Sequence, residues 1–290
     1  LGSRKQAMRL RDRAGWFGWS GWAVAALHVL AAVGGPPSLA VLAIFKNEAH
    51  VLQEWIEHYL REGVDNFFLI DNNSTDRYLP ILAPYIASGR VTLDMCPWRH
   101  SQKVIYNRYR PVLRKWFEWV MVVDLDEFVY SRAPFRSIPA YLASLAPQVS
   151  QVRMPWKIFG SAGYIEQPDG VVKHFTKRTF HGTLGRVATK AIVRMKPLLR
   201  FHIHAHHVRH QTNDSYTGFG AGTQSFAHCG INTLVQKMHL GCISEEILEF
   251  SALHLNHYVL QSWEYFKRVK MTRGAADAAE KEHLRNEAYF

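Results

Sequence analysis

The chain has 290 residues and a formal net charge of +11, with 48% hydrophobic and 20% charged residues. That balance excludes an intrinsically disordered chain, and the length allows one large domain or two small ones. The sparse, odd set of cysteines argues against a disulfide framework and favours a reducing compartment. We therefore expect a cytoplasmic protein, or one in the Golgi or ER lumen if the source is eukaryotic. The cysteines are Cys96, Cys229 and Cys242.

Residues 1–37 are expected to form a segment of their own. A basic run precedes residues 14–33, which carry no formal charge and place Trp16, Trp19 and Trp22 three residues apart. This spacing gathers the rings on one side of a helix, so we expect a helix lying peripherally on an anionic membrane surface. A signal-like segment and an ordinary packing helix are the alternatives. The Gly-Gly-Pro-Pro sequence that follows marks a linker.

Strands and helices then alternate along the chain. Residues 38–45 predict a buried strand, residues 49–61 an amphipathic helix and residues 66–70 a second strand. A right-handed crossover makes such strands parallel neighbours. The polar clusters that follow the two strands should therefore meet at one edge of the sheet.

The next elements lead to an acidic turn. Pro80 and Pro84 are expected to break up the segment after the second strand, because proline ends or kinks helices. Residues 90–95 predict a third strand and residues 101–116 a second helix. Residues 120–123 are rich in β-branched side chains and predict another buried strand.

Two carboxylates, Asp124 and Asp126, follow this strand. Alternate residues of an extended chain share a face, so both are expected to point at one spot. Two close carboxylates repel each other unless a cation lies between them, and hard oxygen ligands suit Mg²⁺ or Mn²⁺. The pattern predicts a site for a metal ion and the phosphates of a nucleotide sugar.

Polar motifs occur in order along the chain, namely Lys46-Asn47-Glu48, Asp71-Asn72-Asn73-Ser74-Thr75-Asp76, Ser101-Gln102-Lys103, Asp124-Leu125-Asp126-Glu127-Phe128 and Asn256-His257-Tyr258 with Arg273-Gly274. Together they resemble the motifs of family 2-like glycosyltransferases and their family 92 relatives, which have the GT-A fold. The resemblance spans about residues 38–276 and leaves 277–290 as a C-terminal tail. It implies an α/β domain with a mostly parallel central sheet.

The resemblance also implies a reaction and its site. We expect an inverting transfer from a nucleoside-diphosphate sugar, with UDP the expected nucleotide, to a hydroxyl of a glycan, lipid-linked or small-molecule acceptor. The expected cofactor is Mn²⁺ or Mg²⁺, held by Asp124, Asp126 and His257. The expected nucleotide-sugar contacts are Lys46, Asn47, Glu48, Asp71, Asn72, Gln102, Lys103, Asp124, Lys270 and Arg273.

Residues that bind the sugar acceptor are expected in the part of the chain that follows the acidic turn. Aromatic rings can stack on a sugar, and glycine lets a backbone approach a ligand closely. The candidates for this pocket are Trp156, Phe159, Gly160 and Ser161. The general base stays open among Glu166, Asp169 and Glu127.

A histidine-rich run supports a different class of protein. His202, His204 and His206 would share one face of a strand, and three imidazoles can bind zinc, iron or copper. A metal-dependent hydrolase or oxygenase is therefore the alternative enzyme. The third hypothesis is a basic membrane- or RNA-binding protein. It lacks the interleaving of basic and aromatic residues found in single-strand binding platforms, so we expect no nucleic-acid partner.

Overall fold

The computed structural model describes residues 39–98, 101–147, 149–179, 185–186, 189–195, 201–203, 208–212, 215–217, 226–228, 231–232, 242–243, 245–273 and 285–290. The predicted membrane-surface segment and most of the histidine run lie outside these residues. Within them, every helix is too short or too polar to cross a bilayer.

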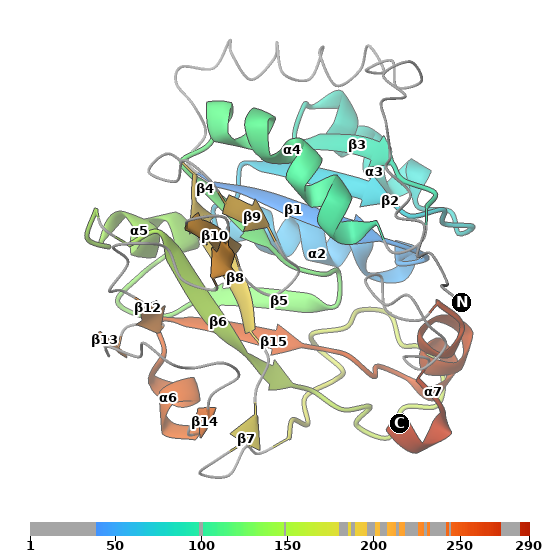
Figure 1. Ribbon diagram of the computed structural model, residues 1–290. Coiled ribbons are helices and arrows are strands. Elements are labelled where there is room, and N and C mark those ends of the chain that lie inside the picture. Colours follow the sequence, from blue (N-terminus) through green and yellow to red (C-terminus); the bar gives the residue numbers. More distant parts are fainter. Residues whose placement is uncertain are drawn as a thin grey trace, which may run out of the picture.

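The first half consists of alternating strands and helices (Figure 1). Strands β3, β2, β1 and β4 lie side by side in that order, and each neighbouring pair is parallel. This confirms the predicted α/β class, with the strand ends gathered at one edge. The elements are β1 (Leu39–Phe45), α2 (Ala49–Arg61), β2 (Asn66–Asp71), α3 (Leu79–Ala87), β3 (Val91–Met95), α4 (Gln102–Trp116) and β4 (Trp119–Val122).

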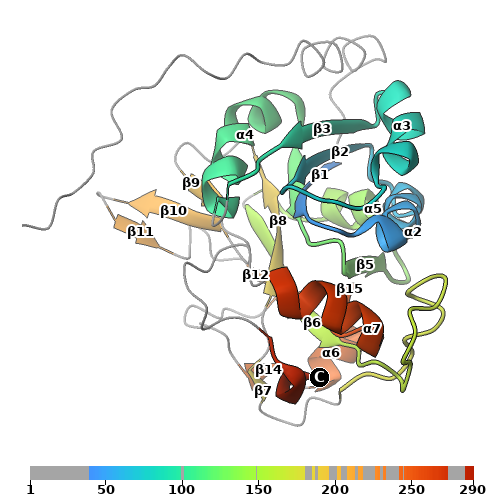
Figure 2. The ribbon, with the colours of Figure 1, turned by 90° about the vertical axis from the view of Figure 1, so that its right-hand side faces the viewer.

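The second half extends the same sheet with mixed strand directions. Strand β8 (Thr189–Arg194) runs antiparallel between β4 and β6 (Gln151–Ile158). Strand β15 (Leu253–His257) is parallel to β6 and antiparallel to β5 (Glu127–Ser131), and the C-terminal helices in red follow it (Figure 2). The remaining elements are α5 (Ile138–Ala143), β7 (Gly185–Arg186), β9 (Phe201–Ile203), β10 (Val208–Thr212), β11 (Ser215–Thr217), β12 (Phe226–His228), β13 (Ile231–Asn232), β14 (Cys242–Ile243), α6 (Glu245–Phe250), α7 (Trp263–Tyr265), the π-helical turn η1 (Phe266–Lys270), α8 (Met271–Arg273) and the 3₁₀ turn η3 (Glu287–Tyr289).

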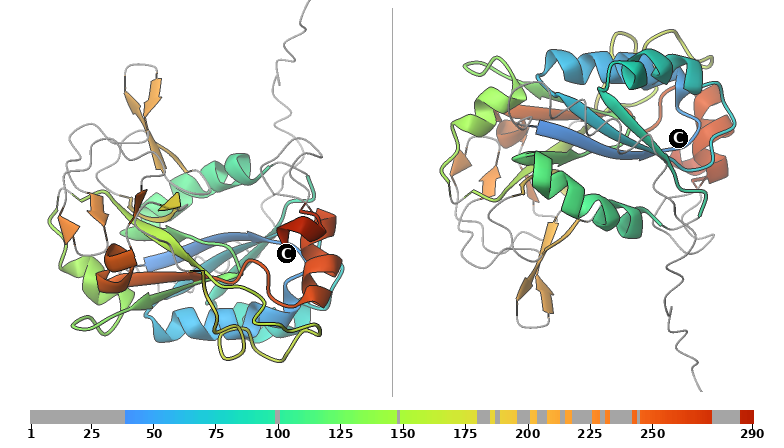
Figure 3. Two further views of the ribbon diagram at one scale, coloured as in Figure 1. Left: turned by 90° about the horizontal axis from the view of Figure 1, so that it is seen from below. Right: turned by 90° about the horizontal axis from the view of Figure 1, so that it is seen from above.

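Helices cover both faces of the parallel strands. Helices α2 and α4 lie on opposite sides of the sheet (Figure 3), so strands buried between them are apolar throughout, as β1 is. Helix α2 buries Trp55 and Tyr59 in one core cluster, and α4 buries Tyr106 and Leu113 in the other.

The prediction that Pro80 and Pro84 break up the segment after β2 is wrong, because α3 is a continuous helix there. Pro80 lies in the first turn, where a backbone N–H would have no helical partner. Pro84 removes one internal hydrogen bond, but Leu82 is fully buried and α3 packs against β3 and α2. Tertiary packing therefore outweighs the local cost of the proline.

His58 joins α2 to β5. Its Nε2 lies 2.8 Å from the carbonyl oxygen of Val129, and its ring packs against Phe128 and Tyr130. Burial lowers the pKa of His58 from 6.5 to about 4. Burial also lowers the pKa of His50, His254 and His257. The fold therefore holds these imidazoles in their neutral form.

We expect the free energy of unfolding to fall as the pH is lowered from about 6.5 towards 4. In that window the unfolded chain binds a proton at His58 that the folded chain does not, so stability declines with acid. The full contribution of His58 is on the order of 3 kcal/mol. Urea unfolding at a series of pH values measures it.

The His58→Gln variant separates this effect from those of the other histidines. Its stability should depend less steeply on pH below 6.5, and the two curves should run parallel above about pH 7.5, where neither state is protonated at this position. Equal slopes below 6.5 would show that His58 is not held neutral by the fold.

Candidate active site

The acidic turn between β4 and β5 is fixed from α2. The indole N–H of Trp55 donates to the carbonyl oxygens of Asp124 and Glu127, at 3.1 and 3.0 Å. The Tyr59 hydroxyl donates to the same Glu127 carbonyl at 3.0 Å and accepts from the Val129 N–H. The buried face of α2 therefore sets the position of the carboxylates that follow the strand.

A buried lysine from β8 pairs with this turn. The Lys190 ammonium lies 2.7 Å from Asp124 Oδ2 and 3.3 Å from Glu127 Oε2, and its side chain is fully buried. Glu127 is also fully buried and accepts from the Asp124 N–H at 2.8 Å. Although burial opposes its charge, the neighbouring Asp124 and Glu127 carboxylates raise the pKa of Lys190. Lys190 is therefore a fixed cation beneath the turn.

Asp126 faces a second set of partners from the C-terminal part of the chain. Its Oδ2 contacts the Lys270 ammonium and lies 3.5 Å from His257 Nε2. The pairing of β15 with β5 aligns His257 with Glu127, and the Tyr258 N–H donates to the Asp126 carbonyl at 2.8 Å. Lys270 ends the π-helical turn η1, a helix type that is common at functional sites.

The loops after β1 and β2 are bonded to each other. Asn47 has a left-handed backbone (φ 56°), its N–H donates to Ser74 Oγ, and its side-chain oxygen accepts from the Thr75 N–H at 2.7 Å. Asp71 is buried and accepts from the Ser74 N–H and the Tyr78 hydroxyl. The two motifs therefore meet at one edge of the sheet, as the sequence predicts. The side-chain oxygens of Asn47 and Asp71 accept hydrogen bonds that hold the loops in place.

The other predicted nucleotide contacts surround the same edge. Asn72 donates to the carbonyl oxygens of Cys96 and Trp98, and Glu48 accepts from the Tyr265 hydroxyl at 2.9 Å. Gln102 is buried and donates to the Tyr106 hydroxyl at 3.1 Å. Lys46 is half-buried and Lys103 is exposed, while the side chain of Arg273 lies outside the described residues.

The predicted acceptor residues lie beside β15. The rings of Trp156 and His257 are 4.2 Å apart between centroids, and those of Phe159 and Tyr258 are 4.8 Å apart. The Gly160 N–H donates to the Lys177 carbonyl. Ser161 Oγ lies 3.4 Å from the Gly163 nitrogen. Of the candidate bases, Glu166 and Asp169 are exposed, whereas Glu127 is not.

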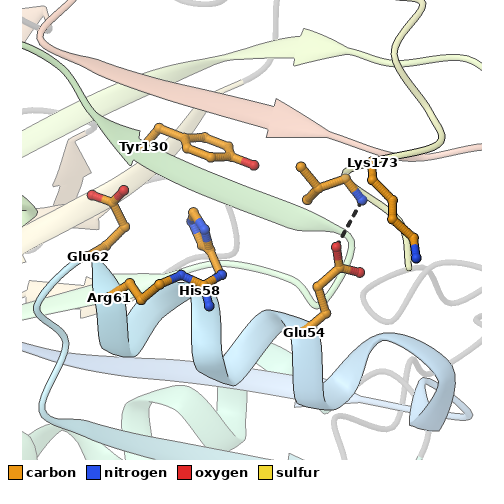
Figure 4. A pocket seen from close by; sticks show the side chains of 7 residues that line it. Glu54, His58, Arg61, Glu62, Tyr130 and Lys173 are labelled. Carbon is orange, nitrogen blue, oxygen red and sulfur yellow. Dashed lines mark hydrogen bonds between the residues drawn. The ribbon is translucent and has the colours of Figure 1, made fainter. Parts of the chain in front are cut away.

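A hollow of about 430 Å³ opens elsewhere, between α2, β5 and the segment at Lys173 (Figure 4). The carboxylates that line it already accept hydrogen bonds from other parts of the chain. Glu54 accepts from the Val171 and Val172 N–H groups, and Glu62 accepts from the backbone and hydroxyl of Ser131. Asp124 and Asp126 are not among its lining residues. The hollow is therefore not the candidate site.

Asp126 and His257 offer a carboxylate oxygen and an imidazole nitrogen, donor types that divalent cations accept. Burial lowers the pKa of His257, so the imidazole is in the neutral form that a metal requires. Its Nδ1 is buried and has no hydrogen-bond partner among the described residues. Those residues hold no cluster of three or more His, Cys, Asp or Glu suited to a metal. Mg²⁺, however, needs only one or two protein carboxylates when substrate phosphates supply the other ligands.

The histidine-run hypothesis falls largely outside the described residues. His202 lies on β9, but its side chain is not described, and neither are His204 and His206. The structure therefore does not test the His-cluster enzyme.

Comparison with known proteins gives the family. The sequence profile of glycosyltransferase family 92 matches residues 40–287, which is most of the chain. The chain belongs to glycosyltransferase family 92. This confirms the family-level resemblance drawn from the motifs.

Similar family 92 proteins occur in plants. One from Oryza sativa subsp. japonica is 27% identical over 79% of this chain and 34% of its own length. Another, from Ricinus communis, is 25% identical over 49% of this chain and 27% of its own length. The chain thus spans about a third or less of the curated relatives that it matches.

Solved structures show weaker similarity. Staphylococcus aureus TarS in complex with UDP superposes with a TM-score of 0.36 at 13% identity, covering 55% of this chain and 47% of that one. Glucosyl-3-phosphoglycerate synthase from Mycobacterium tuberculosis, in complex with Mn²⁺ and UDP-glucose, gives 0.26 at 18% identity, with half of each chain covered. Similarity at this level carries no functional argument.

The sequence analysis did not identify Lys190, whose buried ammonium pairs with Asp124 and Glu127 of the acidic turn. The available signal was a lysine inside an apolar strand, Thr-Lys-Ala-Ile-Val-Arg, where a buried ammonium needs a carboxylate partner. Trp55 and Tyr106 were also missed. Tyr106 fixes β1 by accepting from the Ile44 N–H at 3.1 Å, yet in the sequence it is simply an aromatic residue on a helix.

We expect Lys190→Met to lower the free energy of unfolding by about 3–5 kcal/mol, because it leaves the fully buried Glu127 carboxylate without its cation. Adding Glu127→Gln should recover part of the loss, since the amide oxygen can still accept from the Asp124 N–H. Urea unfolding of the single and double variants measures both.

Lys173→Met is the matched control. Its side chain is 63% exposed and its ammonium lies 3.9 Å from Asp169 Oδ2, so its removal should change stability by no more than about 0.5 kcal/mol. If Lys190→Met proved as mild as this control, Lys190 would not be the cation that holds the turn.

Proposed function

We propose that this chain transfers a sugar, with inversion, from a UDP-sugar to a hydroxyl of a glycan or glycolipid, using Mn²⁺ or Mg²⁺. The observation that supports it is the strand-end carboxylate Asp126 with a buried, neutral imidazole 3.5 Å away, in a family 92 chain. Lipid-linked and small-molecule acceptors are consistent with the same chemistry.

Asp126 and His257 would hold the cation, with Asp124 beside them. Bound there, the ion would neutralise the diphosphate as it departs. Each aspartate already has an ammonium partner, Lys190 for Asp124 and Lys270 for Asp126. A divalent cation that arrives alone would therefore meet carboxylates whose charge the lysines already neutralise. A cation that arrives bound to a diphosphate also carries negative charge, which both ammonium groups attract. We infer that metal and nucleotide bind together.

Lys270 has a second role in this proposal. It must release Asp126 Oδ2 before another cation can use that oxygen. The freed ammonium is then next to the diphosphate, where it stabilises the charge that develops on the leaving group. Lys190 stays in place beneath the turn and keeps Asp124 charged and oriented.

The general base is better sought among exposed carboxylates. Glu127 is fully buried, and its Oε2 is occupied by the Asp124 N–H and Lys190. Glu166 and Asp169 lie in the loop after Gly160 and are accessible to an acceptor. We propose that one of these two deprotonates the acceptor hydroxyl and that Glu127 is a positioning residue.

Titration calorimetry with UDP, with and without Mn²⁺, tests the proposal. We expect Asp126→Asn to abolish the Mn²⁺-dependent part of UDP binding, and His257→Gln to weaken it by about 10–100-fold, as expected for a lost ligand or supporting contact. Lys270→Met should weaken UDP binding while allowing Mn²⁺ to bind more readily without nucleotide.

Glu118→Gln is the control, because this exposed carboxylate pairs with Arg194 and precedes β4, at the opposite end of the strand from the acidic turn, and should leave UDP binding unchanged. Thermal unfolding should show that all variants remain folded. Unchanged Mn²⁺-dependent affinity in Asp126→Asn would refute the metal site. Mn²⁺ that binds equally well with and without UDP in the parent protein would refute joint binding.

A further inference from the structure

Helix α4 presents a face of one charge to solvent. It carries five lysine and arginine residues and contains no aspartate or glutamate. Lys103, Arg108 and Lys115 are exposed along the helix, whereas Ile105 and Tyr106 on the other side are buried in the core. The cationic side is therefore the outer surface of a helix whose apolar side is already packed against the sheet.

Large apolar side chains are exposed next to the start of this helix. Val104 is 74% exposed, Met95 61% and Trp98 51%. They lie within ten residues of one another, at the end of β3, in the connection and in the first turn of α4. Exposed side chains of this size usually occur singly. Three of them beside a basic helix therefore indicate a surface that binds a partner.

The connection that carries Trp98 is held by specific contacts. The Trp98 carbonyl accepts from Asn72 Nδ2 at 3.0 Å and from Ser101 Oγ at 2.8 Å. The indole therefore stays half outside the protein while its backbone is bonded to the loop after β2.

We propose that this surface, the α4 face, docks the protein on an anionic lipid bilayer. The α4 face consists of Met95, Trp98, Val104, Arg108 and Lys115. Cations attract anionic headgroups, while the indole and aliphatic side chains enter the headgroup region, as in amphipathic helices that lie in a membrane interface. A nucleic acid would match the charge but leave Met95 and Val104 in water.

The docked orientation places the candidate active site near the lipid surface. The first turn of α4 also carries Gln102, which donates to the Tyr106 hydroxyl, and that hydroxyl in turn accepts from β1 at Ile44. The helix thus begins at the sheet edge where the acidic turn lies. Given the proposed function, this orientation favours acceptors whose hydroxyl lies close to a membrane, such as glycolipids.

Vesicle co-sedimentation of the full chain tests the proposal. The vesicles are phosphatidylcholine alone or phosphatidylcholine mixed with phosphatidylserine. The basic variant is Arg108→Gln with Lys115→Gln, and the apolar variant is Trp98→Ser with Val104→Ser. The matched control removes the same charge from the side of the sheet that α2 covers, by Arg61→Gln with Lys173→Gln, two residues near the hollow of Figure 4.

We expect the basic variant to bind phosphatidylserine vesicles at least about tenfold more weakly, since each interfacial cation contributes roughly fivefold. The apolar variant should lose the part of binding that survives high salt. The control should bind within about twofold of the parent protein, because its cations do not face the bilayer.

Several outcomes would overturn the proposal. Equal losses in the basic variant and the control would mean that net charge alone drives binding. Full retention of binding in both α4 variants would assign it to another part of the chain. Loss of binding to a single-stranded RNA in the basic variant, with vesicle binding kept, would assign the face to nucleic acid. Mn²⁺-dependent UDP binding, measured on the same variants, should be unchanged and reports separately on the proposed function.

Discussion

The structure depends on how two buried ammonium groups neutralise the carboxylates at the end of β4. Lys190 bridges Asp124 and Glu127 from within the sheet, and Lys270 contacts Asp126 from the C-terminal turn. Glu127 and Asp126 are buried, and charges removed from water are costly unless they are paired, so each lysine stabilises the carboxylate that it contacts. The order of the strands makes this pairing possible, because β8 lies between β4 and β6 and so brings Lys190 next to the turn that follows β4.

The same pairing explains why the site is built from distant parts of the chain. Strand β15 brings His257 next to Asp126 through its register with β5, and the π-helical turn that follows brings Lys270. The parallel half of the sheet provides the edge and the loops that line it. The mixed half provides the cations and the imidazole. Neither half contains a complete site.

The sequence was sufficient for the local elements and for part of the site. Strands β1 and β4 were predictable as continuous apolar runs, and helix α2 from the helical spacing of its apolar residues, because these patterns match how the elements are buried. The bond between Lys190 and Asp124 was not predictable, because it joins residues 66 positions apart and no local pattern encodes it. The bonds from Ser74 and Tyr78 to Asp71 are local, three and seven residues away, and Asp and Ser favour turns of this kind, so the sequence was compatible both with this turn and with a nucleotide contact. Helix α3 was missed because local proline rules do not include the packing of Leu82.

The separation of Asp126 from Lys270 has a consequence for how the protein is made. The ribosome adds Lys270 144 residues after Asp126, and β15 comes almost as late. While the chain is growing, the parallel strands can pair, but the carboxylate that will be buried has no ammonium group to meet. Water must therefore keep access to the end of β4 until the turn that carries Lys270 has left the ribosome. The candidate site would then form only after Lys270 has been added, long after the strand that carries its carboxylates.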